Sequence, residues 1–292
     1  MEELLLSPHE LNAMMAQRQP VALLDTREPR QYAEAHIPGA VNVPVISNYL
    51  ATSDEVGVKA LRNKFAAVFG VVGLSGIETA VLYEQSMDSG HGQSCRGYLL
   101  LKYLGYPAVM ILNGGISAWV AAGLPVTDEV FLAREVHFPI FDTGTDVVIG
   151  RNEMLQALDR PEVIKLDVRD VEEWLGRSSS PYGKDFCPRK GRIPGARWIE
   201  WYRMMKPSPA GPVFKDPEEV RAECHTAGFS ADSPVYVYCF KGSRASNTLV
   251  ALKNAGFKDV RVYFGSWNEW SRDPRLPIDT GLPYGQTARS CE

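Results

Sequence analysis

Short runs of apolar residues alternate with amphipathic segments along most of the chain. Continuous apolar runs bounded by turn-forming residues are typical of strands that are covered on both faces. The amphipathic segments between them have the spacing of crossover helices, so we expect an α/β fold: a mostly parallel sheet with helices on both faces. The expected strands are VALLD (21–25), AVLYE (80–84), VMILN (109–113), VIKLD (163–167), VYVYC (235–239) and VRVYF (260–264).

The same pattern occurs twice, in the same order and with similar spacing. Residues 23–40 contain Asp-x-Arg near their start and Ile-Pro-Gly-Ala at their end, and residues 165–196 repeat both anchors. The first segment has 18 residues and the second has 32, so the second copy carries 14 extra residues between the anchors. LKYLGY (101–106) likewise returns as LKNAGF (252–257). This duplication predicts two tandem α/β domains, residues 1–127 and 147–292, joined by a linker at 128–146.

Composition and net charge limit the cellular compartments and the classes of partner that the sequence favours. The chain has 292 residues, and its formal net charge of −4 at pH 7 gives no general attraction to nucleic acid or to an anionic membrane. The first residues, MEELLLSPHEL, lack the basic start and long apolar core of a secretion signal. The five cysteines are odd in number and widely scattered, without the Cys/His spacing of a zinc site. We therefore expect a cytoplasmic protein with free thiols and no metal, nucleic-acid or membrane partner.

One cysteine stands at a junction between a strand and a helix. Cys239 follows the apolar run of residues 235–238, and the loop Cys-Phe-Lys-Gly-Ser-Arg (239–244) leads into a helical pattern. In open α/β sheets ligands bind at this carboxyl edge, and the N–H groups of a tight loop and of a helix N-terminus attract anions. Lys241 and Arg244 add positive charge, so we expect Cys239 to react as a thiolate. The alternative is a buried cysteine that only packs at the strand end.

The first copy is an internal control for this interpretation. At the position that matches Cys239 it has Glu84, and the loop that follows is about four residues longer. A carboxylate cannot be the sulfur nucleophile, so we expect the first domain to be non-catalytic. We expect it to pack against the second domain and to form one wall of the cleft there. His91, in the longer loop, is expected to be a solvated residue; the alternative is a base contributed across the interface.

Positive charge is concentrated in the second copy. Residues 187–206 contain six Lys or Arg and one Glu, whereas the matching residues 34–50 contain no Lys or Arg. We interpret this stretch as a patch that attracts a small anion; a solvated basic loop is the alternative. Trp198 and Trp201 have no counterpart in the first copy and are candidates for the mouth of the cleft. Trp270 matches Trp119 and is expected in the core.

Three motifs together resemble the rhodanese superfamily: DTREPRQYAEAHIPGA (25–40), CFKGSR (239–244) and GSWNEW (265–270). The doubled layout is similar to that of the two-domain sulfurtransferases, and the resemblance covers nearly the whole chain in order. It implies two tandem rhodanese-like domains, of which only the C-terminal one is catalytic. It also implies that Cys239 takes the outer sulfur of a donor as a persulfide and passes it to cyanide or to a thiol acceptor, which can belong to a protein. No metal and no organic cofactor is implied.

The resemblance also assigns roles to individual residues. Asp167 and Arg169, at the end of the neighbouring strand, are expected to support the catalytic loop. Basic residues in the loop are typical of family members that use thiosulfate, so we expect thiosulfate as the donor, with 3-mercaptopyruvate as the alternative. The residues expected to bind the substrate are Phe240, Lys241, Gly242, Ser243, Arg244 and Arg192, although many relatives have a histidine in place of Arg192.

The sequence leaves two alternative functions of other classes possible. Cysteine-dependent phosphatases and arsenate reductases also use a strand-to-helix loop, but five residues separate their cysteine from their arginine. Here four residues separate Cys239 from Arg244, and the tighter loop is better sized for one sulfur atom than for a phosphoryl group. A non-catalytic binding module of the same fold is the other alternative. The intact loop of the second copy argues against it, because the first copy shows what an unused loop becomes.

Overall fold

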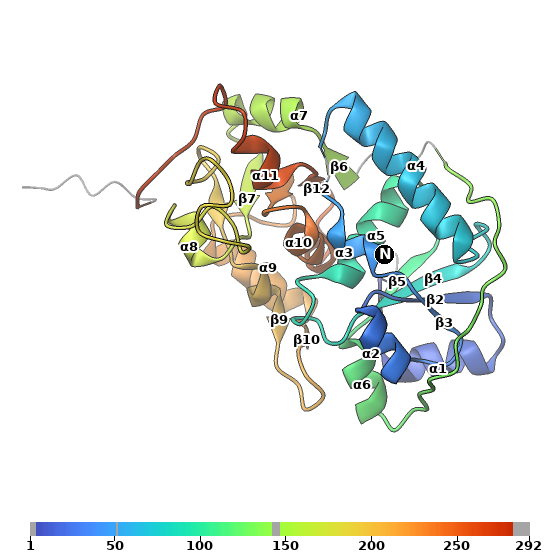
Figure 1. The fold of residues 1–292 in the computed structure, drawn as a ribbon. Coiled ribbons are helices and arrows are strands. Elements are labelled where there is room, and N and C mark those ends of the chain that lie inside the picture. Colours follow the sequence, from blue (N-terminus) through green and yellow to red (C-terminus); the bar gives the residue numbers. More distant parts are fainter. Residues whose placement is uncertain (1–3, 51, 142–146, 283–292) are drawn as a thin grey trace, which may run out of the picture.

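The computed structural model describes residues 4–50, 52–141 and 147–282, which form two halves that lie side by side (Figure 1). The first half consists of β1 (Leu5–Leu6), α1 (Pro8–Ala16), β2 (Val21–Asp25), α2 (Pro29–Glu34), β3 (Ala40–Asn42), α3 (Val45–Asn48), α4 (Glu55–Val71), β4 (Thr79–Tyr83), α5 (Gln93–Tyr103), β5 (Val109–Leu112) and α6 (Gly115–Ala121). The second half consists of β6 (Val148–Ile149), α7 (Arg151–Gln156), η2 (Ala157–Asp159), β7 (Ile164–Asp167), α8 (Val171–Trp174), β8 (Arg197–Trp198), η3 (Trp201–Met204), β9 (Met205–Lys206), β10 (Val213–Phe214), α9 (Pro217–Thr226), β11 (Val235–Tyr238), α10 (Ser243–Asn254), β12 (Val260–Tyr263) and α11 (Ser266–Trp270).

Each half is built on a five-stranded sheet. The strand order is β1-β5-β4-β2-β3 in the first sheet and β6-β12-β11-β7-β8 in the second. All pairings within these two sheets are parallel, and β9 and β10 form a separate antiparallel ribbon. The two orders are equivalent strand by strand, so the repeat in the sequence is a repeat of the sheet. The expected α/β fold with two mostly parallel sheets is confirmed.

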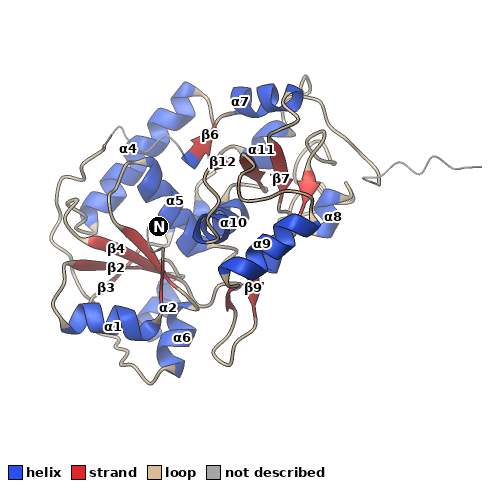
Figure 2. Ribbon diagram, turned by 180° about the vertical axis from the view of Figure 1, so that it is seen from behind, coloured by secondary structure: helices blue, strands red, loops and turns tan. Residues whose placement is uncertain are grey.

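Helices cover both faces of each sheet. Figure 2 shows α4 and α5 on one face of the first sheet and α1, α2 and α6 on the other. The faces that point to the middle of the molecule share one apolar core, which contains residues of α4, α5, α9 and α10. Separate apolar clusters fill the two outer faces. None of the helices in the described ranges is long and apolar enough to cross a membrane.

Helices α5 and α10 pack against each other at the centre of the molecule. Each begins after a glycine with a left-handed backbone, Gly92 (φ +83°) and Gly242 (φ +95°). A Cβ atom on Gly92 would lie 2.8 Å from the carbonyl oxygen of Ser243, so the first half approaches the start of α10 closely. The loops that follow β4 and β11, which are equivalent strands, therefore both lie at the interface between the halves.

The segment after α6 runs along the first half as an extended chain, coloured green in Figure 1. The N–H of Val136 donates to the carbonyl of Gly70 at 3.0 Å, and Phe138 is buried against Tyr106. The linker expected at 128–146 includes residues 142–146, which lie outside the described ranges. The domain boundaries 1–127 and 147–292 stay predictions.

Candidate active site

Cys239 lies at the carboxyl end of β11, the middle strand of the second sheet. Alternate residues of a strand point to opposite faces, and Cys239 follows Val235 and Val237 into the shared core on the side of α10. Its side chain is 1 % exposed. The sulfur is therefore held on the face of the sheet that is turned toward the first half.

The loop after Cys239 supplies backbone N–H donors near the sulfur. The N–H of Gly242 donates to Sγ of Cys239 at 3.1 Å. Within the part of the chain that the structure describes, the N–H groups of Lys241, Ser243 and Arg244 have no hydrogen-bond partner. The first N–H groups of a helix cannot find partners inside it, and α10 has 12 residues. These donors at a helix N-terminus suit an anion.

The other side of the loop is fixed by the first turn of α11. The N–H groups of Trp267 and Asn268 donate to the carbonyls of Cys239 and Phe240, both at 3.0 Å. The N–H of Cys239 donates to the hydroxyl of Ser266 at 3.3 Å. Because α11 binds the loop carbonyls, they do not compete for the N–H groups around the sulfur.

A cavity of about 130 Å³ reaches the side chain of Cys239. One water molecule takes about 30 Å³ in the liquid, so this space admits a molecule of a few heavy atoms and excludes a peptide. Two of its walls come from the 14 extra residues of the second copy and from the long loop of the first half. The residues that line it are His91, Pro181, Tyr182, Cys239, Phe240, Lys241, Ser243 and Arg244.

Lys241 spans the interface between the halves. Its Nζ donates to the carbonyl of Ser47 at 2.7 Å and lies 5.0 Å from the centre of the Tyr182 ring. An ammonium has three N–H donors, so binding Ser47 leaves Lys241 able to donate into the cavity that it lines. The first half thereby holds a cation of the loop that follows Cys239.

Arg244 is buried and its charge is compensated. Its guanidinium donates to both carboxylate oxygens of Glu173, at 2.6 and 3.0 Å, and lies 3.0 Å from the carboxylate of Asp170. Burial acts to lower the pKa of Arg244, but the Glu173 carboxylate raises it above the usual value, so the side chain is charged. The sequence suggested that Arg244 adds net positive charge at the sulfur. The structure shows an ion pair that locks the start of α10 instead.

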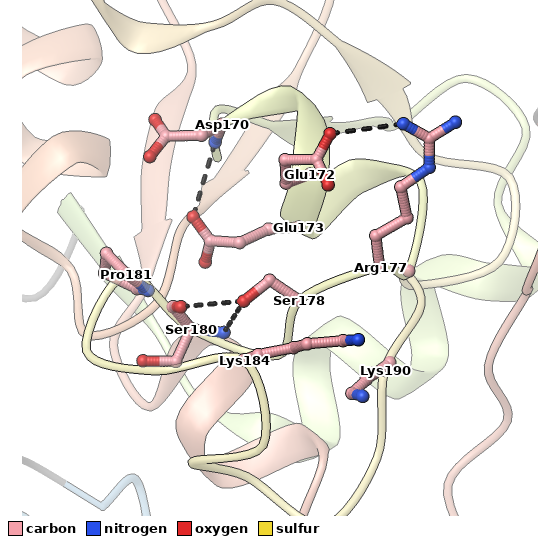
Figure 3. Close-up of a pocket in the computed structure, with 10 residues that line it drawn as sticks. Asp170, Glu172, Glu173, Arg177, Ser178, Ser180, Pro181, Lys184 and Lys190 are labelled. Atoms are coloured by element: carbon pink, nitrogen blue, oxygen red, sulfur yellow. Dashed lines mark hydrogen bonds and ion pairs between the residues drawn. The ribbon is translucent and has the colours of Figure 1, made fainter.

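A second, larger cavity of about 770 Å³ lies on the other side of this ion pair. Figure 3 shows Asp170 and Glu173 on one wall and Lys184 and Lys190 across from them. Pro181 lines both cavities. The Arg244–Glu173 pair therefore separates the small cavity at the cysteine from an open depression with mixed charge.

Both halves match a single protein family. The Rhodanese-like domain matches residues 7–122 and again residues 151–273. The chain belongs to the rhodanese family. The expected pair of tandem rhodanese-like domains is thereby confirmed, and the duplicated sheets are the structural form of that pair.

Relatives of this rhodanese-family chain include named sulfurtransferases. The thiosulfate sulfurtransferase of Azotobacter vinelandii is 29 % identical over 278 residues, 94 % of this chain and 97 % of that protein. A probable 3-mercaptopyruvate sulfurtransferase of Pseudomonas aeruginosa is 31 % identical over 261 residues, 86 % of this chain and 87 % of that protein. The structure of an anaerobic ergothioneine biosynthesis enzyme from Chlorobium limicola matches with a TM-score of 0.81 at 22 % identity, over 96 % of this chain and 70 % of that chain, a likeness of fold alone. The family and these relatives support sulfurtransferase activity.

Asp167 and Arg169 connect β7 to β11, the strand that ends before Cys239. Their buried side chains pair at 2.5 Å, and Asp167 also accepts the hydroxyl of Tyr238 at 2.7 Å, one residue before Cys239. The first rhodanese domain repeats the pair with Asp25 and Arg27 at 2.6 Å. Because both copies have the same pair, it holds the edge of each sheet, which in the second copy carries the loop that follows Cys239.

Arg192 does not line the cavity at Cys239. Its guanidinium donates to the carbonyl of Gly281 at 2.8 Å and lies 4.8 Å from the centre of the Trp174 ring. The other cations of residues 187–206 also bind protein groups: Lys190 pairs with Asp185, and Lys206 pairs with Asp216 at 2.6 Å. The basic stretch therefore ties segments of the second domain together and does not converge on the cysteine.

The loop of the first domain reaches the rim of the cavity. His91 lines the cavity, is exposed, and lies 5.6 Å from Trp201, ring centre to ring centre. Partial desolvation and then the charge of Arg244 lower the pKa of His91, so the imidazole is neutral at pH 7.

Trp198 stacks on Trp174 and does not line the cavity, whereas Trp270 and Trp119 are buried as expected.

The sequence interpretation missed Arg96. This residue lies on α5 of the first domain, is 2 % exposed, and donates through Nη1 to the hydroxyl of Ser243 at 3.1 Å. It stands in the stretch QSMDSGHGQSCRG, which reads as a polar loop. The only signal in the sequence was a positive charge at the start of the helix that aligns with α10.

Among the described residues, no group of three or more His, Cys, Asp or Glu side chains could hold a metal ion.

Proposed function

We propose that this protein is a thiosulfate sulfurtransferase that carries sulfur on Cys239. The observation that carries the proposal is the placement of Sγ of Cys239 against a small cavity, next to backbone N–H groups at the start of α10. A thiolate is the nucleophile in sulfur transfer, and this arrangement favours negative charge both before and after the sulfur is taken up.

The reaction has two half-reactions with balanced charge. In the first, the Cys239 thiolate attacks the outer sulfur of thiosulfate, the sulfur–sulfur bond of the donor breaks, and sulfite leaves with the electron pair. The cysteine then carries a persulfide anion. In the second, cyanide or an acceptor thiolate attacks the terminal sulfur, the persulfide bond breaks, and the Cys239 thiolate is restored. Such a double displacement gives ping-pong kinetics.

The loop residues supply binding without taking part in bond making. The N–H groups of Gly242, Ser243 and Arg244 are positioned to hold the terminal sulfur of the persulfide. Lys241 lines the cavity and offers N–H donors to the sulfonate oxygens of thiosulfate. Phe240, 1 % exposed, packs against the ring of Tyr182 and forms an apolar wall. We assign Arg192 no contact with the donor.

Thiosulfate is preferred as donor because the loop presents a lysine to a small cavity. A dianion gains more from an ammonium and a helix N-terminus than a carboxylate with a single charge does. The 31 % identical relative named as a probable 3-mercaptopyruvate sulfurtransferase keeps that donor as the alternative. The four free cysteines among the described residues fit a reducing compartment, so we also propose a cytoplasmic location.

Donor preference tests this assignment. We expect Lys241→Ala to lower kcat/KM for thiosulfate about tenfold more than for 3-mercaptopyruvate, with cyanide as acceptor. Lys258→Ala, which removes an exposed lysine in the connection from α10 to β12, is the matched control and should change neither value. Cys239→Ser should have no turnover with either donor. A larger loss with 3-mercaptopyruvate than with thiosulfate would reverse the donor assignment.

A further inference from the structure

Arg96 brings a guanidinium from the non-catalytic domain to the catalytic loop. Nη1 donates to the Ser243 hydroxyl at 3.1 Å, and Nη2 donates to the carbonyl of Tyr49. Ser243 is the first residue of α10 and lines the cavity together with Cys239. The side chain of Arg96 therefore lies directly behind one wall of the site, where it is shielded from solvent.

Arg96 differs from the other buried arginines in its counter-charge. The structure describes five arginines that are buried, and three of them, Arg27, Arg169 and Arg244, pair with carboxylates. Arg192 lies against an indole ring. Among the described residues, Arg96 has neither an acidic partner nor an aromatic face, and its two hydrogen-bond acceptors are neutral. A buried cation without a counter-charge is costly, so its environment needs an anion from elsewhere.

The sulfur of Cys239 is the group that can supply that anion. Burial lowers the pKa of Arg96 to about 10, and the negative charge of the Cys239 thiolate acts against this shift. The guanidinium is thus charged at pH 7, and it lies behind the wall that Ser243 forms beside the sulfur, within electrostatic reach of it. The interaction is mutual, so the charge of Arg96 favours an ionised sulfur on Cys239. Since Ser243 accepts a hydrogen bond from Arg96, its own O–H is left to donate.

We propose that Arg96 is the counter-charge for the sulfur anion on Cys239, so that the non-catalytic domain completes the active site. The inference rests on the proposed function, because it assigns the anion to the cysteine that carries sulfur. Arg96 acts across the interface as a positioning residue: its charge stabilises the thiolate and the persulfide, and its hydrogen bond sets the Ser243 hydroxyl as a donor to the cavity.

The pH profile of Cys239 alkylation by iodoacetamide, followed by intact mass, tests the inference. The other ionisable groups around the sulfur are the same in every variant: Lys241, His91, Tyr182 and Arg244 with its partners Glu173 and Asp170. We expect Arg96→Gln to move the midpoint of the profile upward by about one pH unit, which makes alkylation at pH 7 roughly tenfold slower. Arg96→Lys, which keeps the charge, should stay within about 0.3 unit of wild type.

Controls separate a local charge effect from a loss of folding. Arg27→Gln removes another buried arginine of the first domain and should lower the melting temperature without moving the midpoint. Should Arg96→Gln fail to fold, Ser243→Ala removes the hydroxyl that holds the guanidinium, and an upward shift in that variant supports the inference. If Arg96→Gln folds and keeps the wild-type midpoint, the inference is overturned. If Arg96→Gln does not fold, a wild-type midpoint in Ser243→Ala overturns it instead. A separate result tests the proposed function itself. If the wild-type protein takes up no sulfur from thiosulfate on Cys239, the proposed function is overturned too, whatever midpoints the variants show.

Discussion

Single residues distinguish the two domains at the ends of their equivalent strands β4 and β11. At the end of β4, the position that matches Cys239 holds Glu84, whose buried carboxylate accepts the hydroxyl of Ser94 at 2.7 Å and the N–H of Gln93 at 3.2 Å. Those groups belong to the first turn of α5. The donors that face a sulfur in the second domain are thus occupied in the first domain by a carboxylate of the chain itself, which closes that site.

The buried Glu84 makes stability depend on pH. Burial outweighs the hydrogen bonds of the carboxylate and raises the pKa of Glu84 to about 7, from an ordinary value of 4.5. Between these values the folded protein holds a proton that the unfolded chain has released, so the free energy of unfolding falls as the pH rises from 4.5 through about 7. We expect Glu84→Gln to remove this slope and to gain about 3 kcal/mol relative to wild type over that range.

Urea denaturation at a series of pH values measures this difference. Glu34→Gln removes an exposed carboxylate of the same domain and should run parallel to wild type at every pH. If the stability difference between Glu84→Gln and wild type were constant from acidic to neutral pH, the proton on Glu84 would not be the cause.

The sequence predicted some site residues and not others, for physical reasons. Cys239 and its loop follow from local order, since a strand, a glycine turn and a helix are adjacent in the chain. The partner of Arg244 is Glu173, 71 positions away in sequence, so the compensation of its charge could not be read from the loop. Arg96 approaches the site only because α5 and α10 pack together, which no local pattern encodes.

At the scale of elements, long apolar runs were reliable and short edge strands were not. The six expected strands correspond to β2, β4, β5, β7, β11 and β12, each within one residue at either end. The two-residue strands β1, β6 and β8 are too short to produce a pattern, and they form because a neighbouring strand offers free backbone groups. The middle strands carry the edge with the candidate site, so the part of the sheet that positions this site was the predictable part.

The starts of α5 and α10 are in close contact beside the loop that follows Cys239. A Cβ atom at Gly92 would lie 2.9 Å from Cβ of Asn247 as well as near the Ser243 carbonyl, and the backbone there is left-handed. We expect Gly92→Ala to cost about 2 to 4 kcal/mol in unfolding free energy, from backbone strain plus overpacking. Turnover should also fall about tenfold or more, because α10 is displaced.

Gly39→Ala is the matched control for this substitution. Gly39 has nearly the same φ, +82°, but nothing lies within 4 Å of the position that a Cβ atom would take there, so only the backbone strain of about 1 to 2 kcal/mol applies. Chemical denaturation and thiosulfate turnover on both variants measure the difference. Equal losses of stability, with activity intact in both, would show that the contact between the helices does not position the loop.

At the scale of the whole molecule, the two domains pack together as one unit. They share an apolar core, and polar contacts cross between them at several points. Ser53 of the first domain donates to both carboxylate oxygens of Glu269, and Asn113 accepts the N–H of Phe214 at 3.0 Å. The first domain has Glu84 where the second has Cys239, and it supplies groups around that cysteine: the Ser47 carbonyl that holds Lys241, the Arg96 guanidinium, and His91 at the rim.

Intact mass spectrometry after incubation with thiosulfate tests the central claim most directly. Wild-type protein should gain the mass of one sulfur atom, located on the peptide that contains Cys239, and lose it on addition of cyanide. Cys239→Ser, with the other cysteines unchanged, should gain none. Equal uptake by both proteins, or a label that maps to another cysteine, would contradict the account.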